Sequence, residues 1–357
     1  MIKRFVSIFL LPALMLVLCA GWAQAQASKS AQAAKAKAAE AAKSAKPAEA
    51  TLPRPPKPAK SYTIGVLIPQ LSNPHFIGQA FGYTDEAEKL GARIILHDAG
   101  GYQYIEKQVA QMEDLIASKV DAIDLVAING SATVPMVDAA VAAGIPVINC
   151  NVMTENPKVV TRIRSDDTEI GEKQADFMAK ALNYKGNVVM LRGPAGTSWA
   201  QIRGDSFKKR MAAIAPNIKI LGEQFSQSTP QDGMRLMEDF LQTFPQIDGV
   251  YNGADMTGVG AANALQAAGK AGKVIITATD LQPDNEKFLR TGAMTATVLQ
   301  QTVTIGRWCI RATIDYLEHR PLQKEYFTPL SLATKDTIDK VDMTTVRAPV
   351  GWKPPVR

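Results

Sequence analysis

The chain has little histidine, and its few chemically reactive side chains do not form the patterns of a catalytic site. Its three histidines, His75, His97 and His319, are far apart in the sequence and show no metal-ligand spacing. Ser198 does not lie in a nucleophile elbow. The stretch Gly196-Thr197-Ser198 lacks the lysine and the spacing of a phosphate-binding loop. These absences argue against an enzyme, and we expect neither a cofactor nor a bound metal.

Cysteine is also scarce, with three residues in the whole chain. Cys19 lies in the N-terminal leader described below. Cys150 and Cys309 are far apart in the sequence, and each has apolar neighbours. Exported proteins can form disulfides, but the chain has no CxxC motif. We predict two buried free thiols.

Long hydrophobic runs are absent except at the N-terminus. A basic start, which includes Lys3 and Arg4, precedes the apolar run Phe5–Leu18 and then small residues. A membrane-spanning helix needs about 20 apolar residues, so this shorter run predicts a secretory signal peptide over residues 1–26 and export to the periplasm. Lipidation at Cys19 is the alternative, but the bulky residue before it is unsuited to that processing.

The folded part of the chain lacks an excess of positive charge. Residues 27–60 are rich in Ala, Lys and Pro and hold eight Lys or Arg against two Glu. This composition predicts a disordered linker, which acts as a tether or touches an anionic surface. Residues 61–357 hold 30 basic and 32 acidic residues, so no basic patch supports binding of nucleic acid.

Strand-like runs alternate with amphipathic helical segments along the body of the chain. The first strand, Ile64–Ile68, is apolar and rich in β-branched residues, and a helical pattern begins near Ile77. Similar units recur up to about residue 280, with a restart after Ser165-Asp166-Asp167. This alternation indicates parallel sheets. We therefore predict an α/β fold of two doubly wound lobes with a cleft between them.

The loop after the first strand is the first candidate binding element. Ligands of open α/β sheets bind at the carboxyl ends of the strands. Asn73 can donate and accept hydrogen bonds, and Phe76 offers an apolar face to a small polar ligand. The alternative is that Ser72-Asn73-Pro74 only forms the turn before a helix. For Asp166-Asp167, hinge support or helix capping is favoured over a catalytic role.

Several stretches, in order, resemble the type I periplasmic binding proteins of the ribose/galactose-binding branch. They include Leu71–Phe76, Gln111–Ile116, Gly144–Ile148, Ser165-Asp166-Asp167, Gly196-Thr197-Ser198 with Arg203-Gly204, Ala264–Lys270, and Gln300 with Ile305-Gly306. The resemblance implies two lobes joined by a three-crossover hinge. It places residues 61–164 and about 302–330 in the first lobe, and residues 165–301 and about 331–357 in the second.

The resemblance also implies a set of ligand-binding residues. They are Asn73, His75, Phe76, Asn129, Asn151, Trp199, Arg203, Asp255, Asp280 and Gln300. Six of them carry many donors and acceptors but only two formal charges, of opposite sign: Asn73, Asn129, Asn151, Arg203, Asp280 and Gln300. That inventory favours a neutral polyhydroxyl ligand, sugar-like, or a strongly dipolar one.

Three departures from the ribose-type pattern leave two functions open. Asn151-Val152 stands where such receptors show Asp-Arg, Ala254 replaces a common Asn, and His75 replaces an aromatic residue. Ala99–Tyr102 resembles the sensor-accessory proteins of the trimethylamine-N-oxide respiratory system. The first hypothesis is a monomeric receptor that delivers a small solute to a membrane ABC permease. The alternative is an accessory protein that signals to a membrane histidine kinase.

Overall fold

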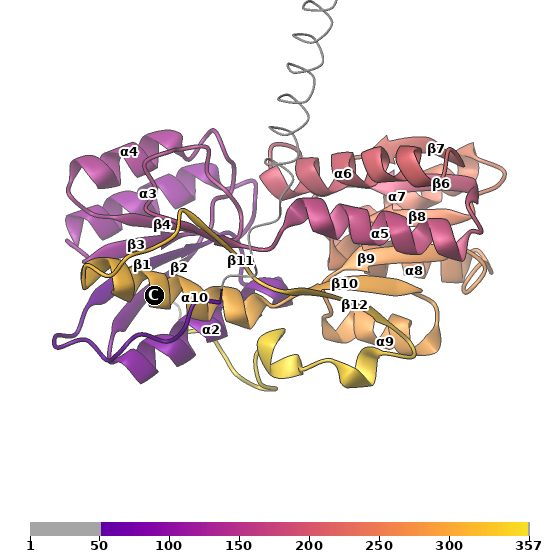
Figure 1. Ribbon diagram of the computed structural model, residues 1–357. Helices are drawn as coiled ribbons and strands as arrows, with labels where there is room; N and C mark the ends of the chain where they lie inside the picture. The colour runs from indigo at the N-terminus through magenta and orange to yellow at the C-terminus, as the bar shows by residue number, and fades with distance from the viewer. Residues whose placement is uncertain (1–50, 356–357) are drawn as a thin grey trace, which may run out of the picture. The chain divides into compact units, whose positions relative to one another are not determined.

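The computed structural model describes residues 51–355, apart from the side chain of Asp284. Two lobes are visible, each built on one six-stranded sheet with helices on both faces (Figure 1). The predicted α/β fold of two doubly wound lobes is confirmed. Among the described helices, none has both the length and the apolar character needed to cross a membrane.

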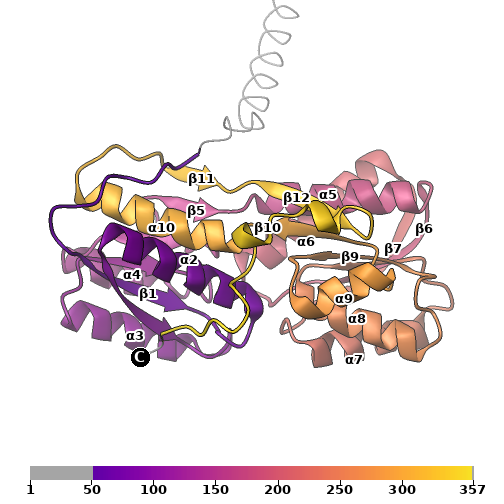
Figure 2. The ribbon, with the colours of Figure 1, turned by 90° about the horizontal axis from the view of Figure 1, so that it is seen from below.

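The first sheet is parallel throughout, with the strand order β11-β5-β4-β3-β1-β2. Its strands are β1 (Thr63–Ile68), β2 (Arg93–Asp98), β3 (Ala122–Leu125), β4 (Val147–Cys150), β5 (Arg162–Arg164) and β11 (Glu325–Phe327). Helices α2 (Pro74–Leu90) and α10 (Thr302–Leu317) cover one face, and α3 (Ile105–Ala117) and α4 (Val134–Ala142) cover the other (Figures 1 and 2). The interior strand β1 is buried on both faces, as its apolar run predicts.

The second sheet has the order β12-β10-β9-β8-β6-β7 and is parallel except for the antiparallel β12. Its strands are β6 (Lys185–Leu191), β7 (Asn217–Gln224), β8 (Gly249–Asn252), β9 (Ile275–Thr279), β10 (Ala296–Gln300) and β12 (Leu330–Thr334). Helices α5 (Asp167–Ala181) and α6 (Ser198–Ile214) lie on one face, and α7 (Pro230–Thr243), α8 (Asp255–Ala267) and α9 (Pro283–Thr291) on the other (Figure 2). Two short 3₁₀ turns follow, Ile338–Lys340 and Met343–Thr345.

Three crossovers connect the sheets. They lie at Ser165-Asp166 after β5, at Gln301 after β10, and at Thr328-Pro329 between β11 and β12. The hydroxyl oxygens of Ser165 and Thr328 are 3.1 Å apart, so a hydrogen bond joins two of the crossovers. The C-terminal segment then returns to the first lobe, where the ring of Trp352 lies 5.4 Å from that of Phe81.

Local capping explains where two of the helices begin. The side chain of Asn73 accepts a hydrogen bond from the backbone N–H of His75 and caps α2, which begins at a proline. The side chain of Asp166 accepts from the backbone N–H groups of Thr168 and Glu169 and caps α5. Asp166 therefore has the capping role that its position before a helix predicts.

Residues 51–60 lie on the first lobe, although the composition predicts a disordered linker up to residue 60. Leu52 is 5% exposed. The guanidinium of Arg54 donates to both carboxylate oxygens of Glu86, at 2.6 and 3.0 Å. Arg311 donates to the same carboxylate at 2.8 Å and to the carbonyl oxygen of Leu52 at 2.8 Å. The linker prediction is wrong for this segment, because composition does not show that Glu86 is buried and needs cationic partners.

The predicted signal peptide and the rest of the predicted linker lie outside the described residues. The same holds for Cys19 and the lipidation alternative.

Replacing Arg54 with alanine should lower the free energy of unfolding by about 1 kcal/mol, because Arg311 still partners the buried carboxylate. Burial raises the pKa of Glu86, but Arg54 and Arg311 outweigh it and hold that pKa below its ordinary value. The contribution is therefore present at neutral pH and is lost as the solution becomes acidic. Urea denaturation at neutral and at acidic pH measures this contribution to the free energy of unfolding. Lys57→Ala, in the same segment, is the control. Equal effects of the two variants would contradict the role of the ion pair.

A disulfide joins Cys150, the last residue of β4, to Cys309 in α10. Both residues are fully buried, and their Cα atoms are 6.2 Å apart. The prediction of two free thiols is wrong. The two cysteines are 159 residues apart in the sequence, and only the packing of α10 on the first sheet brings them together.

Candidate ligand-binding site

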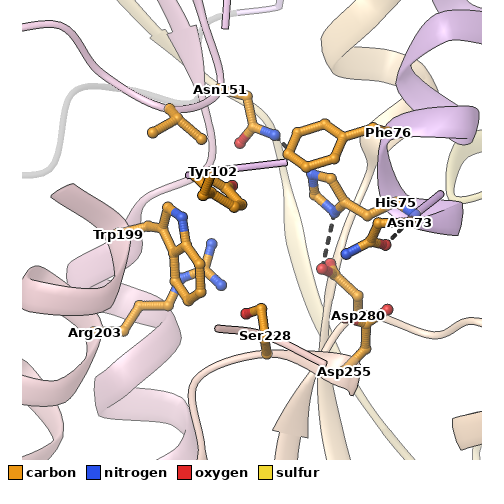
Figure 3. Close-up of a pocket in the computed structure, with 12 residues that line it drawn as sticks. Asn73, His75, Phe76, Tyr102, Asn151, Trp199, Arg203, Ser228, Asp255 and Asp280 are labelled. Carbon is orange, nitrogen blue, oxygen red and sulfur yellow. Dashed lines mark hydrogen bonds and ion pairs between the residues drawn. The ribbon is translucent and has the colours of Figure 1, made fainter. Parts of the chain in front are cut away.

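A cavity lies between the two lobes and receives side chains from both (Figure 3). The space between its lining atoms is about 360 Å³. The residues that line it are Asn73, His75, Phe76, Tyr102, Asn151, Val152, Trp199, Arg203, Ser228, Ala254, Asp255 and Asp280. The cavity thus combines aromatic rings with many hydrogen-bonding groups.

The lining side chains of the first lobe follow the carboxyl ends of three parallel strands. His75 and Phe76 lie in the first turn of α2, after β1. Tyr102 lies in the loop after β2, and Asn151 directly follows β4. The three strands are parallel members of one sheet, so their carboxyl ends lie at the same edge, where ligands of such sheets bind.

The second lobe supplies side chains from helix N-termini and strand ends. Trp199 and Arg203 lie one turn apart on α6, Asp255 is the first residue of α8, and Asp280 follows β9. Ser228 lies in the loop between β7 and α7. The carboxyl ends of the second sheet thus face the same cavity as those of the first.

Three of these residues have a left-handed backbone conformation that is uncommon for residues other than glycine. The φ angles are 62° at Asn151, 58° at Ser228 and 71° at Asp280. Asparagine and aspartate tolerate this conformation better than most residues, whereas serine does not share that preference. Such backbone conformations cluster at functional sites, where the surrounding structure maintains them.

A chain of hydrogen bonds crosses the cavity from one lobe to the other (Figure 3). The carboxylate of Asp280 lies 2.9 Å from Nδ1 of His75. Nε2 of His75 lies 2.6 Å from Nδ2 of Asn151, which also donates to Oε1 of Gln79 at 3.2 Å. The two lobes are therefore in direct contact through His75 and Asp280.

Arg203 is held by its own lobe. Its Nε donates to Oδ1 of Asp167 at 2.7 Å, and its Nη1 donates to the carbonyl oxygen of Gly253 at 3.0 Å. Its guanidinium carbon lies 4.9 Å from the centre of the Trp199 ring. Burial would lower the pKa of Arg203, but the nearby carboxylates of Asp167 and Asp280 raise it.

Two buried carboxylates face the cavity, and their surroundings move their pKa values in opposite directions. Burial would raise the pKa of Asp280, but His75, Arg203 and Gln300 stabilise its charged form and lower the pKa below the ordinary value. Burial, and next the negative charge of Asp280, raise the pKa of Asp255 to about 7. At neutral pH, Asp280 is thus ionised and Asp255 is partly protonated.

Of the ten predicted site residues, eight line this cavity and two do not. Those that line it are Asn73, His75, Phe76, Asn151, Trp199, Arg203, Asp255 and Asp280. Asn129 instead accepts from the hydroxyl of Ser131 and the backbone N–H of Ala132. Gln300 lies behind the cavity and donates to both carboxylate oxygens of Asp280, at 3.0 and 3.2 Å.

Besides the apolar Val152 and Ala254, the sequence reasoning missed two polar lining side chains, Tyr102 and Ser228. Both lie in irregular loops, where no periodicity indicates the direction of a side chain. A partial signal exists for Ser228, because the helix-starting pair Thr229-Pro230 follows it. Among residues 51–355, no group of three or more His, Cys, Asp or Glu side chains is arranged to hold a metal ion.

Comparison with known proteins identifies the family of the chain. Residues 64–321 match the family model described as the periplasmic binding protein domain. The chain is 31% identical over 276 residues to the ribose import binding protein of Bacillus subtilis, covering 77% of this chain and 88% of that protein. It is 28% identical over 262 residues to the D-allose-binding periplasmic protein of Escherichia coli, covering 70% and 83%.

A solved structure agrees with these sequence matches. It is a periplasmic solute-binding protein of an ABC transporter from Actinobacillus succinogenes with bound D-allose. The TM-score is 0.73 at 25% sequence identity, and the match covers 79% of this chain and 100% of that chain. The family match spans most of the body of the chain, and a relative above 30% identity spans more than two thirds of the whole. The chain therefore belongs to the periplasmic binding protein family, whose members bind solutes and are not enzymes.

Proposed function

We propose that this protein is the solute-binding receptor of an ABC transporter and that its ligand is a small polyhydroxyl molecule of the sugar class. The observation that carries the proposal is the buried cavity lined from both lobes by hydrogen-bonding side chains and by the rings of Phe76, Tyr102 and Trp199. Aromatic faces pack on the apolar face of a sugar ring, and amide and carboxylate groups bind its hydroxyls. The ribose and D-allose specificities of the compared proteins agree with this ligand class.

The receptor must open to admit its ligand. His75 contacts Asp280 across the cavity, and Oγ of Ser198 accepts a hydrogen bond from the backbone N–H of Met153 at 3.3 Å. Both contacts join one lobe to the other, so they break when the lobes separate at the crossovers near Ser165, Gln301 and Thr328. Ligand binding then favours closure, because only the closed form surrounds the ligand with both sets of side chains.

The receptor acts as an exported monomer in the periplasm, and its signal peptide is removed. Its macromolecular partner is the membrane permease, which receives the ligand from the closed form. This assignment rests on the family of the chain and on the basic and apolar N-terminal sequence.

Thermal-shift measurements with D-ribose, D-allose and polyols test the proposed ligand class, because a ligand that binds only the native state raises the melting temperature. Isothermal titration then gives the dissociation constant, and small-angle scattering should show a smaller radius of gyration with ligand. A panel in which no sugar or polyol raises the melting temperature would overturn the proposal.

Asp280→Asn should weaken ligand binding by about 1–3 kcal/mol, since a buried ligand donor loses its charged acceptor. This cost corresponds to a dissociation constant roughly 5- to 150-fold weaker. Asparagine is preferred to alanine here because the φ of 71° is better tolerated by asparagine. Titration calorimetry with the best sugar measures the change, and the exposed Asp336→Asn serves as control. Unchanged affinity in a folded variant would place the ligand elsewhere.

One observation favours the sensor-accessory alternative. Tyr102 enters the cavity from the stretch Ala99–Tyr102, which resembles such proteins, and the φ of 94° at Gly100 shapes that loop. The two functions differ in the membrane partner. Stimulation of a reconstituted permease ATPase by the liganded protein supports transport, and a change in kinase autophosphorylation supports sensing.

A further inference from the structure

The cavity holds more negative charge than the sequence inventory indicates. Asp255 and Asp280 both line it, and they are 2% and 4% exposed. The positive charge of Arg203 is already balanced by Asp167, which its guanidinium contacts at 2.7 Å. The ring of His75 is already engaged by Asp280, whose carboxylate lies 2.9 Å from its Nδ1. Asp255 is therefore the cavity carboxylate without a paired cation.

The carboxylates of Asp255 and Asp280 also differ in their hydrogen-bond partners. Asp280 is contacted by His75 at 2.9 Å and by the amide of Gln300 at 3.0 and 3.2 Å. Oδ2 of Asp255 is buried and has no hydrogen-bond partner among the described residues. A buried carboxylate oxygen without a donor is costly. An orphaned acceptor that borders a ligand cavity thus marks the position of a donor on the ligand.

The nature of this donor follows from the charges around it. The titratable and charged groups that face Asp255 are Asp280 after β9, His75 at the start of α2, Arg203 on α6 and Tyr102 in the loop after β2. A ligand hydroxyl would supply one hydrogen bond but would add no positive charge beside the two acidic side chains. An ammonium group supplies up to three donors and the missing positive charge.

We propose that the natural ligand carries an ammonium group, as an amino sugar or amino polyol does, and that this group donates to the unpartnered Oδ2 of Asp255. The inference rests on the proposed function and specifies the ligand class of that same cavity. The hydroxyl groups of the ligand bind the remaining polar side chains. The rings of Phe76 and Tyr102, whose centres lie 6.3 Å apart, line the same cavity.

Titration calorimetry with matched pairs of small molecules tests directly whether a positive charge on the ligand strengthens binding. The pairs are D-glucosamine against D-glucose and 1-amino-1-deoxy-D-glucitol against D-glucitol, with N-acetyl-D-glucosamine as a neutral derivative. The amines should bind at least about tenfold more tightly than their neutral partners, which corresponds to about 1.4 kcal/mol.

The pH dependence supplies a second readout. The pKa of Asp255 is about 7 in the empty protein, so raising the pH from about 6 to about 8 ionises this carboxylate. Binding of 1-amino-1-deoxy-D-glucitol should strengthen over that range, because its amine stays protonated. D-glucitol lacks the charge and should show a weaker dependence. Parallel pH profiles for the two molecules would overturn the inference.

The variant Asp255→Asn tests whether Asp255 causes the tighter binding of the amines. The substitution keeps the shape of the side chain and removes a buried negative charge, so the melting temperature should stay the same or rise. The ratio of amine to neutral affinity should fall towards one, whereas the exposed Asp336→Asn should leave it unchanged. A ratio that persists in folded Asp255→Asn would overturn the assignment.

The outcomes separate this inference from the proposed function. If neutral sugars bind and the amines show no advantage, the ammonium inference is overturned and the sugar receptor stands. If neither set of molecules binds, both are overturned.

Discussion

Replacing Arg203 with alanine is expected to lower the free energy of unfolding by about 3–5 kcal/mol, the usual cost of removing one partner of a buried ion pair. The pair consists of Arg203 and Asp167, each about 5% exposed at its side chain. Without the guanidinium, the carboxylate of Asp167 and the carbonyl oxygen of Gly253 lose their donors. Sequence reasoning alone predicts that folding survives this substitution, because it gives Arg203 only a ligand-binding role.

Arg210→Ala is the matched control for this effect. Arg210 lies on the same helix, α6, and pairs with Asp176 at the same distance of 2.7 Å. Its side chain is 42% exposed and that of Asp176 is 49% exposed, so the pair should contribute less than about 1 kcal/mol. Urea denaturation of the two variants compares the buried and the exposed pair. Equal, small losses in both variants would contradict the structural role of Arg203.

The double variant Arg203→Ala/Asp167→Ala tests the mechanism further. It should be more stable than Arg203→Ala alone, because it also removes the buried carboxylate, whose remaining cation, Arg164, lies 3.9 Å away. If adding Asp167→Ala lowers the free energy of unfolding further, the cost of removing Arg203 arises from lost packing and not from the buried carboxylate.

Removing the disulfide, as Cys150→Ala/Cys309→Ala, should lower the free energy of unfolding by about 2–5 kcal/mol. The bridge joins residues that are 159 positions apart and so restricts a large part of the unfolded chain. It also attaches α10 to β4. Helix α10 follows the crossover at Gln301, and β4 precedes Asn151, which lines the cavity. Scanning calorimetry of the oxidised parent and the variant gives the size of the effect.

A reducing agent provides the control for this prediction. Dithiothreitol present during unfolding should lower the melting temperature of the parent towards that of the variant, and should leave the variant unchanged. An equal melting temperature for the oxidised parent and the variant would contradict a stabilising disulfide.

Much of the fold was predictable because it depends on local patterns. The apolar run Ile64–Ile68 indicates a strand buried on both faces, and β1 is buried accordingly. Asn73 before Pro74 is typical of a helix start, and its side chain caps α2. Its position at the end of a parallel strand also indicates a binding loop, and Asn73 lines the cavity as well. Asn73 thus caps the helix and also borders the cavity, and its contact with a ligand stays a prediction.

Other features were not predictable, because they depend on residues that are distant in the sequence. The linker composition of residues 51–60 does not reveal that Glu86 is buried on α2 and pairs with Arg54. Asn129 ends a strand-like run, as Asn151 does, but its side chain accepts a hydrogen bond from the backbone of its own loop. Tyr102 and Ser228 reach the cavity from loops whose course no hydrophobic pattern describes.

The alternation of strands and helices up to about residue 280 and the two lobes can be inferred from the sequence alone. Hydrophobic periodicity and helix capping act over a few residues, so they can be read along the chain. The distribution of the charges depends on the folded structure. The fold pairs Arg203 with Asp167, 36 residues away, and leaves Asp255 beside Asp280 without a cation. Burial and the distance between charges set these energies, and both depend on neighbours in space.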